Sequence, residues 1–375
     1  MQLPSSKSFL SNTSTIYFAP GRVNLIGEHV DYNGGHVLPF ALDRGICLSI
    51  TQAGNWRFSS EQFIDVFETV RLEDFKIRKH KWYDFILGVV HWFYAKGYKI
   101  PTFHITVSSD LPAGAGLSSS AALSVAVVMA MGDLLGLNFE ENEIAIIAQQ
   151  VENDYVGVSC GIMDQIVSAY GRKDKVLLLN CQTLKKEFIP LNFNDYELII
   201  SHSGKSRILS DSWFNVRQQE CQTALQFAQK FYAIEALCQL DSVELFFDVH
   251  EPWAKRAIHV IEENARVVEA AKFLKSNDLQ SLAFNMNQSH DSLKANYEVT
   301  GYELDTIVAE ARKIEGVLAA RMSGAGFGGC SINLVHRDAV EGFYTKLRAA
   351  YIPLTGLPIE FYRAVAGAGA QKQEL

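Results

Sequence analysis

Apolar and polar residues recur in the first half of the chain in patterns that predict both strands and helices. Short β-rich runs predict strands at residues 16–18, 44–51 and 103–107. The apolar stretch from Leu117 to Leu135 is long enough for a buried helix. Between residues 142 and 155 the apolar positions recur at helical spacing, and this phase leaves Glu152 on or beside the polar face.

The second half of the chain is mainly helical. Apolar runs predict strands at residues 176–180, 197–203 and 331–335. Helical patterns cover residues 212–232, 254–275, 278–295 and 302–315. Because strands and helices mix without a regular βαβ repeat, the predicted fold class is α+β. A turn-rich stretch around Pro190 suggests two domains at residues 1–185 and 186–375, and the Gly/Ala-rich segment Ala366–Ala370 suggests a flexible end.

Composition and charge bound the class of protein. The chain has 375 residues, of which 48% are hydrophobic and 20% charged, as in a globular protein with a sizeable core. This length also favours two domains. The net charge of −8 and the lack of a Lys/Arg run argue against sequence-independent binding to nucleic acid, which requires neutralisation of phosphates.

Other features indicate a soluble intracellular protein of the size of an enzyme. The longest apolar stretch, residues 121–137, is interrupted by Ser124 and Asp133 and falls short of a membrane span. The first 15 residues lack the apolar segment of a signal peptide. The six cysteines lie far apart without the spacing of a zinc site, as expected for thiols in a reducing compartment. We therefore expect a cytoplasmic protein with no membrane and no nucleic acid among its partners.

The first segment with unusual chemistry is APGRVNLIGEHVDYNGG, residues 19–35. It is too irregular for a single helix or strand, and it gathers Glu28, His29 and Asp31 among glycines, together with Arg22. The acceptors and donors of these side chains suit a hydroxyl-rich ligand such as a sugar. A solvated loop with a local Arg–Asp pair is the alternative.

The second segment is LPAGAGLSSSAAL, residues 111–123. Its glycines allow a ligand to approach the backbone closely, and three serines open an apolar helix. The free N–H groups and the dipole of a helix N-terminus favour a phosphate, and serine hydroxyls are oxygen ligands that Mg²⁺ accepts. A tightly packed helix start made of small residues is the alternative.

The third segment is SGAGFGG, residues 323–329. It contains Gly324-x-Gly326, but no helical pattern follows, so it is a poor match to a dinucleotide-binding fingerprint. A turn between a helix and a strand explains it equally well.

Taken together, these segments resemble the GHMP small-molecule kinases, and within them the branch that phosphorylates galactose. GRVNLIGEHVDY resembles the signature of that branch, and the Gly/Ser-rich segment resembles the family's ATP-binding loop. CGIMDQ (160–165), YEVTGYELD (297–305) and RMSGAGFGGC (321–330) are similar to further family motifs, in the same order. The resemblance implies a two-domain α+β fold with the active site in the interdomain cleft. It also implies transfer of the ATP γ-phosphoryl group to the anomeric hydroxyl of galactose.

The resemblance also implies a role for individual residues. Asp164 is the expected base for the sugar C1 hydroxyl, and Arg22 beside it would stabilise charge on the transferring group. The residues expected to bind the sugar are Glu28, His29, Val30, Asp31, Gly161 and Phe214. Those expected to hold the ATP phosphates are Gly114, Ala115, Gly116, Leu117, Ser118, Ser119 and Ser120. Ser120 and Glu152 would bind Mg²⁺, although Glu152 could instead be a solvated helix residue.

Phe214 departs from the pattern of the family. Seven residues before Cys221 the family usually has a tyrosine that contacts the sugar, and here the hydroxyl is missing. Two alternatives therefore stay open beside a galactose kinase. One is a kinase for a related sugar, such as N-acetylgalactosamine or arabinose. The other is a non-catalytic galactose sensor, against which the presence of both Arg22 and Asp164 argues.

Overall fold

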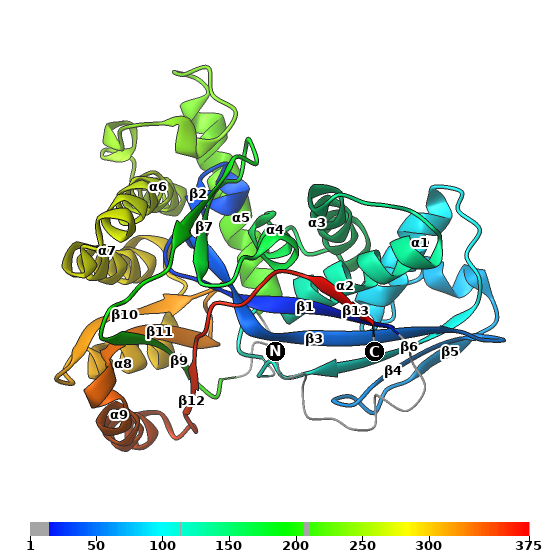
Figure 1. Ribbon diagram of the computed structural model, residues 1–375. Coiled ribbons are helices and arrows are strands. Elements are labelled where there is room, and N and C mark those ends of the chain that lie inside the picture. Colours follow the sequence, from blue (N-terminus) through cyan, green and yellow to red (C-terminus); the bar gives the residue numbers. More distant parts are fainter. Residues whose placement is uncertain (1–14, 113, 206–209, 375) are drawn as a thin grey trace.

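The computed structural model describes residues 15–112, 114–205 and 210–374, which form two lobes joined side by side (Figure 1). Residues 1–14, which hold most of the stretch expected to lack a signal peptide, and Ala113 of the Gly/Ser-rich segment lie outside the described residues. Within the described part, no helix has the length and apolarity needed to cross a bilayer.

Three sheets form the β-structure of the described residues, and helices lie between their strands along the chain. The α+β prediction is therefore confirmed. The six-stranded sheet has the order β13 (Gln371–Glu374), β1 (Thr15–Asn24), β3 (Pro39–Gln52), β6 (Phe103–Ser109), β4 (Trp56–Ser60) and β5 (Phe67–Thr69). The four-stranded sheet has the order β10 (Val317–Ser323), β11 (Cys330–His336), β9 (Tyr196–His202) and β12 (Glu360–Arg363). The small sheet consists of β2 (His36–Val37), β7 (Lys175–Asn180) and β8 (Lys186–Pro190).

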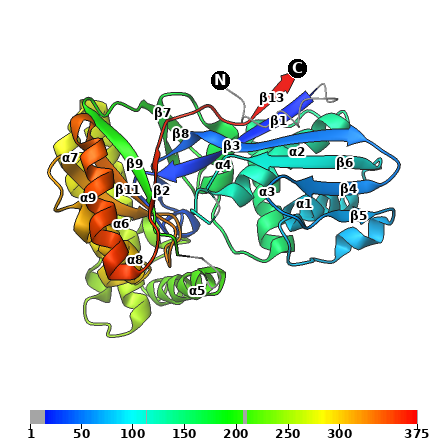
Figure 2. The same ribbon diagram turned by 90° about the horizontal axis from the view of Figure 1, so that it is seen from below.

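The helices divide between the two lobes (Figure 2). Those beside the six-stranded sheet are α1 (Asp84–Ala95), α2 (Ser119–Leu134), α3 (Glu141–Gln150) and α4 (Met163–Tyr170). Those in the other lobe are α5 (Ser210–Ala228), α6 (Pro252–Ser276), α7 (Leu279–Ser292), α8 (Gly301–Ala311) and α9 (Val340–Thr355). The helix α2 packs directly on β1 and β3, whereas α7 and α8 pack on β10.

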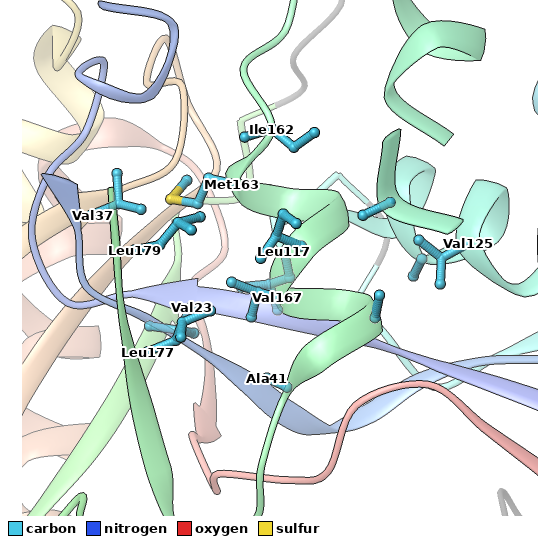
Figure 3. Close-up of a cluster of buried hydrophobic side chains, with 14 of the residues drawn as sticks. Val23, Val37, Ala41, Leu117, Val125, Ile162, Met163, Val167, Leu177 and Leu179 are labelled. Carbon is cyan, nitrogen blue, oxygen red and sulfur yellow. The ribbon is translucent and has the colours of Figure 1, made fainter. Parts of the chain in front are cut away.

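A buried apolar cluster holds together the elements that carry the site residues. Figure 3 shows Val23 of β1, Val167 of α4 and Leu177 of β7 pointing toward one another, with Leu117 close by. All four side chains are at most 4% exposed. Burying an aliphatic side chain of this size contributes about 1.5–3 kcal/mol. The cluster therefore fixes β1 and the N-terminal ends of α2 and α4 relative to one another.

The segment predicted as one helix over residues 142–155 changes its geometry part-way. After α3 ends at Gln150, the chain continues as a π-helix over Val151–Val156. The wider π turn rotates the following side chains relative to the α-helical phase, and such turns are frequent at functional sites. Glu152 is consequently buried, with 5% of its surface exposed. The placement of Glu152 on or beside the polar face is therefore wrong.

The Gly/Ala-rich tail is an ordered part of the first lobe, so the prediction of a flexible end is wrong. Gly367 N–H donates to the carbonyl of Ala41 at 2.8 Å, and a Cβ on Gly367 would overlap the backbone of Leu42. The small residues allow one backbone to run against another. Strand β13 then pairs antiparallel with β1. The last residues thus join the N-terminal lobe, and the division into residues 1–185 and 186–375 stays a proposal for the rest of the chain.

Candidate active site

An irregularity in β1 directs Arg22 toward the centre of the molecule. The register between β1 and β3 shifts between Pro20 and Arg22, and a bulge of this kind re-aims a side chain. Gly21 lies at the shift, where a Cβ would overlap the carbonyl oxygen of Leu117. The N–H of Arg22 donates to the same oxygen at 3.1 Å. The glycine therefore allows β1 to touch the loop that precedes α2.

The guanidinium of Arg22 holds Asp164 in a two-pronged ion pair. Its Nε and Nη2 atoms each lie 2.7 Å from a different carboxylate oxygen of Asp164, the second residue of α4. Its Nη1 donates to the carbonyl of Gly116 at 2.8 Å, and the Ser118 hydroxyl donates to Oδ2 of Asp164. Paired charge-assisted bonds fix orientation as well as energy. The carboxylate is held in one position and remains 27% exposed.

The loop before α2 turns through left-handed backbone conformations. Gly114 and Gly116 both have φ of 71°, and Ser118 has φ of 62°. Glycine adopts this region freely, whereas a residue with a side chain pays about 1–2 kcal/mol. The turn brings the N-terminus of α2 to a cavity, into which Ser119 and Ser120 face. Free N–H groups and the helix dipole make this end suitable for phosphate.

The cavity has a volume of about 370 Å³ and draws residues from both lobes. Thirteen of the predicted site residues line it: Arg22, Glu28, His29, Asp31, Gly114, Gly116, Ser118, Ser119, Ser120, Glu152, Gly161, Asp164 and Phe214. The structure does not bring Val30, Ala115 or Leu117 into the lining. These three side chains are packed in the core, so any role in binding falls to their backbone atoms.

Burial keeps His29 neutral and hydrogen bonds fix its tautomer. Desolvation lowers the pKa of His29 to about 3. Its Nε2 lies 3.2 Å from the carbonyl of Ala325, which only accepts, so Nε2 carries the proton. Its Nδ1 lies 2.8 Å from the Tyr32 hydroxyl, which therefore donates to it. The imidazole is thus held between the signature loop and the other lobe.

Asp31 and Gly161 are matched in shape. A Cβ on Gly161 would overlap the Asp31 carboxylate, so only glycine leaves room for it. Burial, and then repulsion by the nearby charge of Asp164, raise the pKa of Asp31 to about 7. A partly buried carboxyl that lines the cavity is placed to exchange hydrogen bonds with a ligand.

Glu152 and Ser120 form the candidate metal site. Burial raises the pKa of Glu152 to about 7, with repulsion by Asp164 in the same direction. Hydrogen bonds from Gln165 and Ser120 oppose this rise, and Gln165 Nε2 lies 2.9 Å from Glu152 Oε1. A buried carboxylate beside a hydroxyl supplies the hard oxygen donors that Mg²⁺ prefers. The alternative of a solvated helix residue does not hold for Glu152.

Phe214 closes the cavity beside His29 and Tyr32. It lies on α5, and its ring is half-buried against His29 and Tyr32, with centroid separations of 5.7 and 5.3 Å. Aromatic packing at this range is favourable. The ring therefore shapes the wall and provides no hydrogen-bonding group.

Sequence reasoning missed Arg321, which ties the two lobes together at the site. This side chain is fully buried on β10, forms an ion pair with Glu28 and donates to the carbonyl of Leu25 at 3.0 Å. The N–H of Gly324 also donates to Glu28, at 3.1 Å. A lone arginine within the apolar run VLAARMS was the available signal, because a buried cation requires a partner.

The third glycine-rich segment also contributes to the site. Gly324 and Ala325 line the same cavity as the loop that precedes α2. The segment connects β10 to the antiparallel β11, so the alternative of a turn between a helix and a strand is wrong. The reason is that residues 317–323, which follow α8, form a strand of their own.

Comparison with known proteins agrees with this geometry. Three family models match: the galactokinase galactose-binding signature over residues 6–52, the GHMP kinases N terminal domain over 84–172 and the GHMP kinases C terminal model over 270–353. Galactokinase of Clostridium perfringens (strain SM101 / Type A) is 41% identical, covering 98% of this chain and 99% of the relative. The chain belongs to the galactokinase family. Galactokinase of Bacillus subtilis (strain 168) is 40% identical, covering 95% and 94% of the two chains.

Solved structures show the same fold. The galactokinase of Lactococcus lactis complexed with galactose superimposes with a TM-score of 0.92 at 37% identity, covering 98% of this chain and 97% of that one. The mevalonate kinase of Methanococcus jannaschii has a TM-score of 0.69 at 18% identity, covering 94% and 98%, and shares the fold. The two-lobed GHMP kinase architecture predicted for this galactokinase family member is therefore confirmed, and the protein is an ATP-dependent sugar kinase.

Proposed function

We propose that this enzyme transfers the γ-phosphoryl group of ATP to the C1 hydroxyl of D-galactose, giving galactose 1-phosphate and ADP. The observation that carries the proposal is the position of the Arg22–Asp164 pair. It opens into a cavity between the N-terminus of α2 on one side and the Glu28, His29 and Asp31 cluster on the other. In this arrangement the N-terminus of α2 suits the phosphate donor and the Arg22–Asp164 pair suits the reacting centre. The cluster on the other side suits a polyhydroxyl acceptor.

Asp164 is proposed as the base. As the C1 oxygen forms its bond to the γ-phosphorus and the bond from that phosphorus to the ADP oxygen breaks, the hydroxyl proton passes to the Asp164 carboxylate. Arg22 orients that carboxylate through both oxygens, and its charge stabilises the transferring group. Phosphoryl transfer depends mainly on positioning and charge stabilisation, and a fixed Arg–Asp fork provides both.

Ser120 and Glu152 are proposed to hold Mg²⁺ together with the ATP phosphates. Mg²⁺ is usually bound by one or two carboxylates plus phosphate oxygens and water, so two protein ligands suffice. Among the described residues no group of three His, Cys, Asp or Glu side chains forms a separate metal site. When bound, the ion neutralises charge on the β- and γ-phosphates.

Glu28, His29 and Asp31 are proposed to recognise the sugar hydroxyls. The Asp31 carboxylate and the ordered His29 ring face the cavity from one loop. Phe214 is the one observation that favours a second candidate, a kinase for a related sugar, because its ring offers no hydrogen bond where a tyrosine is usual. The remaining polar groups supply most of the recognition, so galactose is the favoured substrate.

We further propose that the enzyme works in the cytoplasm. All six cysteines are free, including Cys160 at the edge of the cavity. Free thiols are typical of a reducing compartment. The relevant check is to compare activity in reducing and oxidising buffers.

A coupled ADP-release assay with a panel of sugars tests the proposed function. Galactose should give the highest kcat/KM, above N-acetylgalactosamine, arabinose and glucose, and the activity should require Mg²⁺. Asp164→Asn serves as the matched control for contaminating kinases, since it removes the proposed base with little change in shape. A higher kcat/KM for another aldose would assign the enzyme to that sugar, and ADP release without any sugar acceptor would contradict the proposal.

A further inference from the structure

A second cavity lies outside the catalytic cleft, between α1 and the π-helix that carries Glu152. Its volume is about 380 Å³. The side chains that matter in its lining are Lys76, Arg78, His91, Lys96, Asp154 and Tyr155, which we call the basic pocket. None of these residues lines the catalytic cleft. No residue of the basic pocket has been given a role so far.

The charge of the basic pocket is opposite to that of the chain. Lys76, Arg78 and Lys96 line the pocket with one carboxylate, Asp154, in a protein whose net charge is −8, and Arg78 also forms an ion pair with the buried Asp84. The ammonium of Lys96 lies over the ring of Trp92 with 5.5 Å to the centroid. A cation–π contact of this kind holds an ammonium in place without using its N–H donors. The pocket therefore presents exposed positive charge, and the ring contact leaves the N–H donors of Lys96 available to a ligand.

Three buried polar atoms in the same lining have no hydrogen-bond partner among the described residues. They are Nε of Arg78, Nδ1 of His91 and the hydroxyl of Tyr155. Arg78 Nε lies 3.6 Å from Oδ2 of Asp84, which is too long for a hydrogen bond. Buried polar groups without partners are uncommon, and each needs an explanation such as a bound ligand. Their gathering in one cationic pocket indicates a ligand with several acceptor atoms.

We propose that the basic pocket binds a phosphorylated small molecule. A phosphate group offers acceptor oxygens and negative charge to Lys76, Arg78 and Lys96, for which charge-assisted bonds are strong. The cavity is larger than one phosphate, and the rings of Trp92 and Tyr155 supply an apolar wall for the remainder of the ligand.

The position of the basic pocket couples it to the metal site. Asp154 and Tyr155 follow Glu152 in the same π-helix, Val151–Val156. A Cβ on Gly88 of α1 would overlap the side chain of Val151 and crowd the Tyr155 ring, so α1 and this π-helix are in close contact. A ligand that contacts Tyr155 would therefore restrain the π-helix that positions Glu152. This part of the inference rests on the proposed function, because it assigns Glu152 to Mg²⁺.

Inorganic phosphate is the probe for the first test, which does not depend on catalysis. The full-length protein is titrated by calorimetry with a non-hydrolysable ATP analogue and Mg²⁺ present, so that the cleft phosphate site is filled. We expect saturable binding that Lys76→Gln and Lys96→Gln each weaken about tenfold, the loss for one charge-assisted contact. Both lysines are exposed, so these variants should fold. Lys99→Gln, an exposed lysine outside the pocket, is the matched control and should bind phosphate as the parent does.

Two results would overturn the site. One is the absence of saturable phosphate binding to the parent, and the other is equal affinity in the parent, Lys76→Gln and Lys96→Gln. Arg78→Gln provides an independent variant, because the Asp84 carboxylate keeps its bonds from the N–H groups of Lys79 and Lys81. It should weaken phosphate binding to a similar degree.

The second test addresses the coupling. The Mg²⁺ concentration that gives half-maximal rate is measured with and without saturating phosphate. We expect at least a twofold shift in the parent and none in Lys96→Gln. Phosphate binding at the pocket without any shift would overturn the coupling and leave the site standing. If the parent showed no sugar-kinase activity, the proposed function would be contradicted. The calorimetric test of the pocket does not depend on that activity.

Discussion

Replacing Glu152 with glutamine should stabilise the ligand-free protein above neutral pH. Burial raises the pKa of this carboxyl from 4.5 to about 7 in the folded chain. The unfolded chain therefore ionises Glu152 at lower pH than the folded chain does. The parent loses stability as pH rises from about 4.5 to about 7, and glutamine, which does not titrate, avoids this loss.

The size of the effect follows from the same pKa values. One pKa unit corresponds to about 1.4 kcal/mol, so Glu152→Gln should gain about 3 kcal/mol at pH 8 and about 1 kcal/mol at pH 5. The amide preserves the shape of the side chain, and its oxygen can still accept from Gln165. The gain appears only without Mg²⁺ and ATP, since bound Mg²⁺ would favour the carboxylate.

Chemical denaturation at pH 5, 6.5 and 8, in chelator and without nucleotide, measures this difference. Glu315→Gln, which changes an exposed carboxyl, is the matched control and should shift stability by less than about 0.5 kcal/mol at each pH. The reasoning is refuted if Glu152→Gln is no more stable than the parent at pH 8, or if its advantage is the same at pH 5. In the active assay the same variant should require more Mg²⁺ for half-maximal rate.

Three further predictions concern the reaction. Asp164→Asn should lower the single-turnover rate by about 10²–10⁴-fold while galactose still binds, and a parental rate would remove Asp164 from the mechanism. Phe214→Tyr should lower the galactose KM about two- to tenfold through one added hydrogen bond, with little change in kcat, whereas unchanged kinetics would show that the ring does not face the sugar. Ser118→Gly should not lower the unfolding free energy, because relief of the left-handed strain, about 1–2 kcal/mol, offsets the added chain entropy of about 0.5–1 kcal/mol. It should nevertheless slow single-turnover transfer several-fold, since Asp164 loses a donor, and Ser118→Ala should be equally slow. A parental rate in both variants would show that this hydrogen bond does not position the base.

Much of the site could be predicted because its chemistry is local in sequence. The signature loop and the Gly/Ser-rich loop each carry several site residues within a few positions, and glycine and serine in such density indicate a special backbone. Asp164 and Arg22 lie 142 positions apart, and only the resemblance to a family paired them. The two-pronged contact between Arg22 and Asp164 also depends on the bulge at Gly21, and the hydrophobic pattern of the sequence does not reveal that bulge.

What could not be predicted depends on packing between distant segments. The π-helix at Val151–Val156 keeps a helical hydrophobic pattern, so its rotation of Glu152 is invisible in the sequence. Arg321 was overlooked because its partner, Glu28, lies 293 positions away. The composition of Ala366–Ala370 is the same whether the small residues serve flexibility or close backbone approach. Only the contact with β3 distinguishes the two.

The pairing of β13 with β1 has a consequence for how this protein is made. Synthesis delivers Thr15 long before its cross-strand partner Glu374. At about 5–20 residues per second, the outer edge of the strand that carries Arg22 stays unpaired on the ribosome for on the order of half a minute. An open strand edge is a template for pairing with another chain. Nascent copies interrupted before β13 emerges therefore carry an open strand edge, and ribosome stalling late in translation should yield insoluble enzyme.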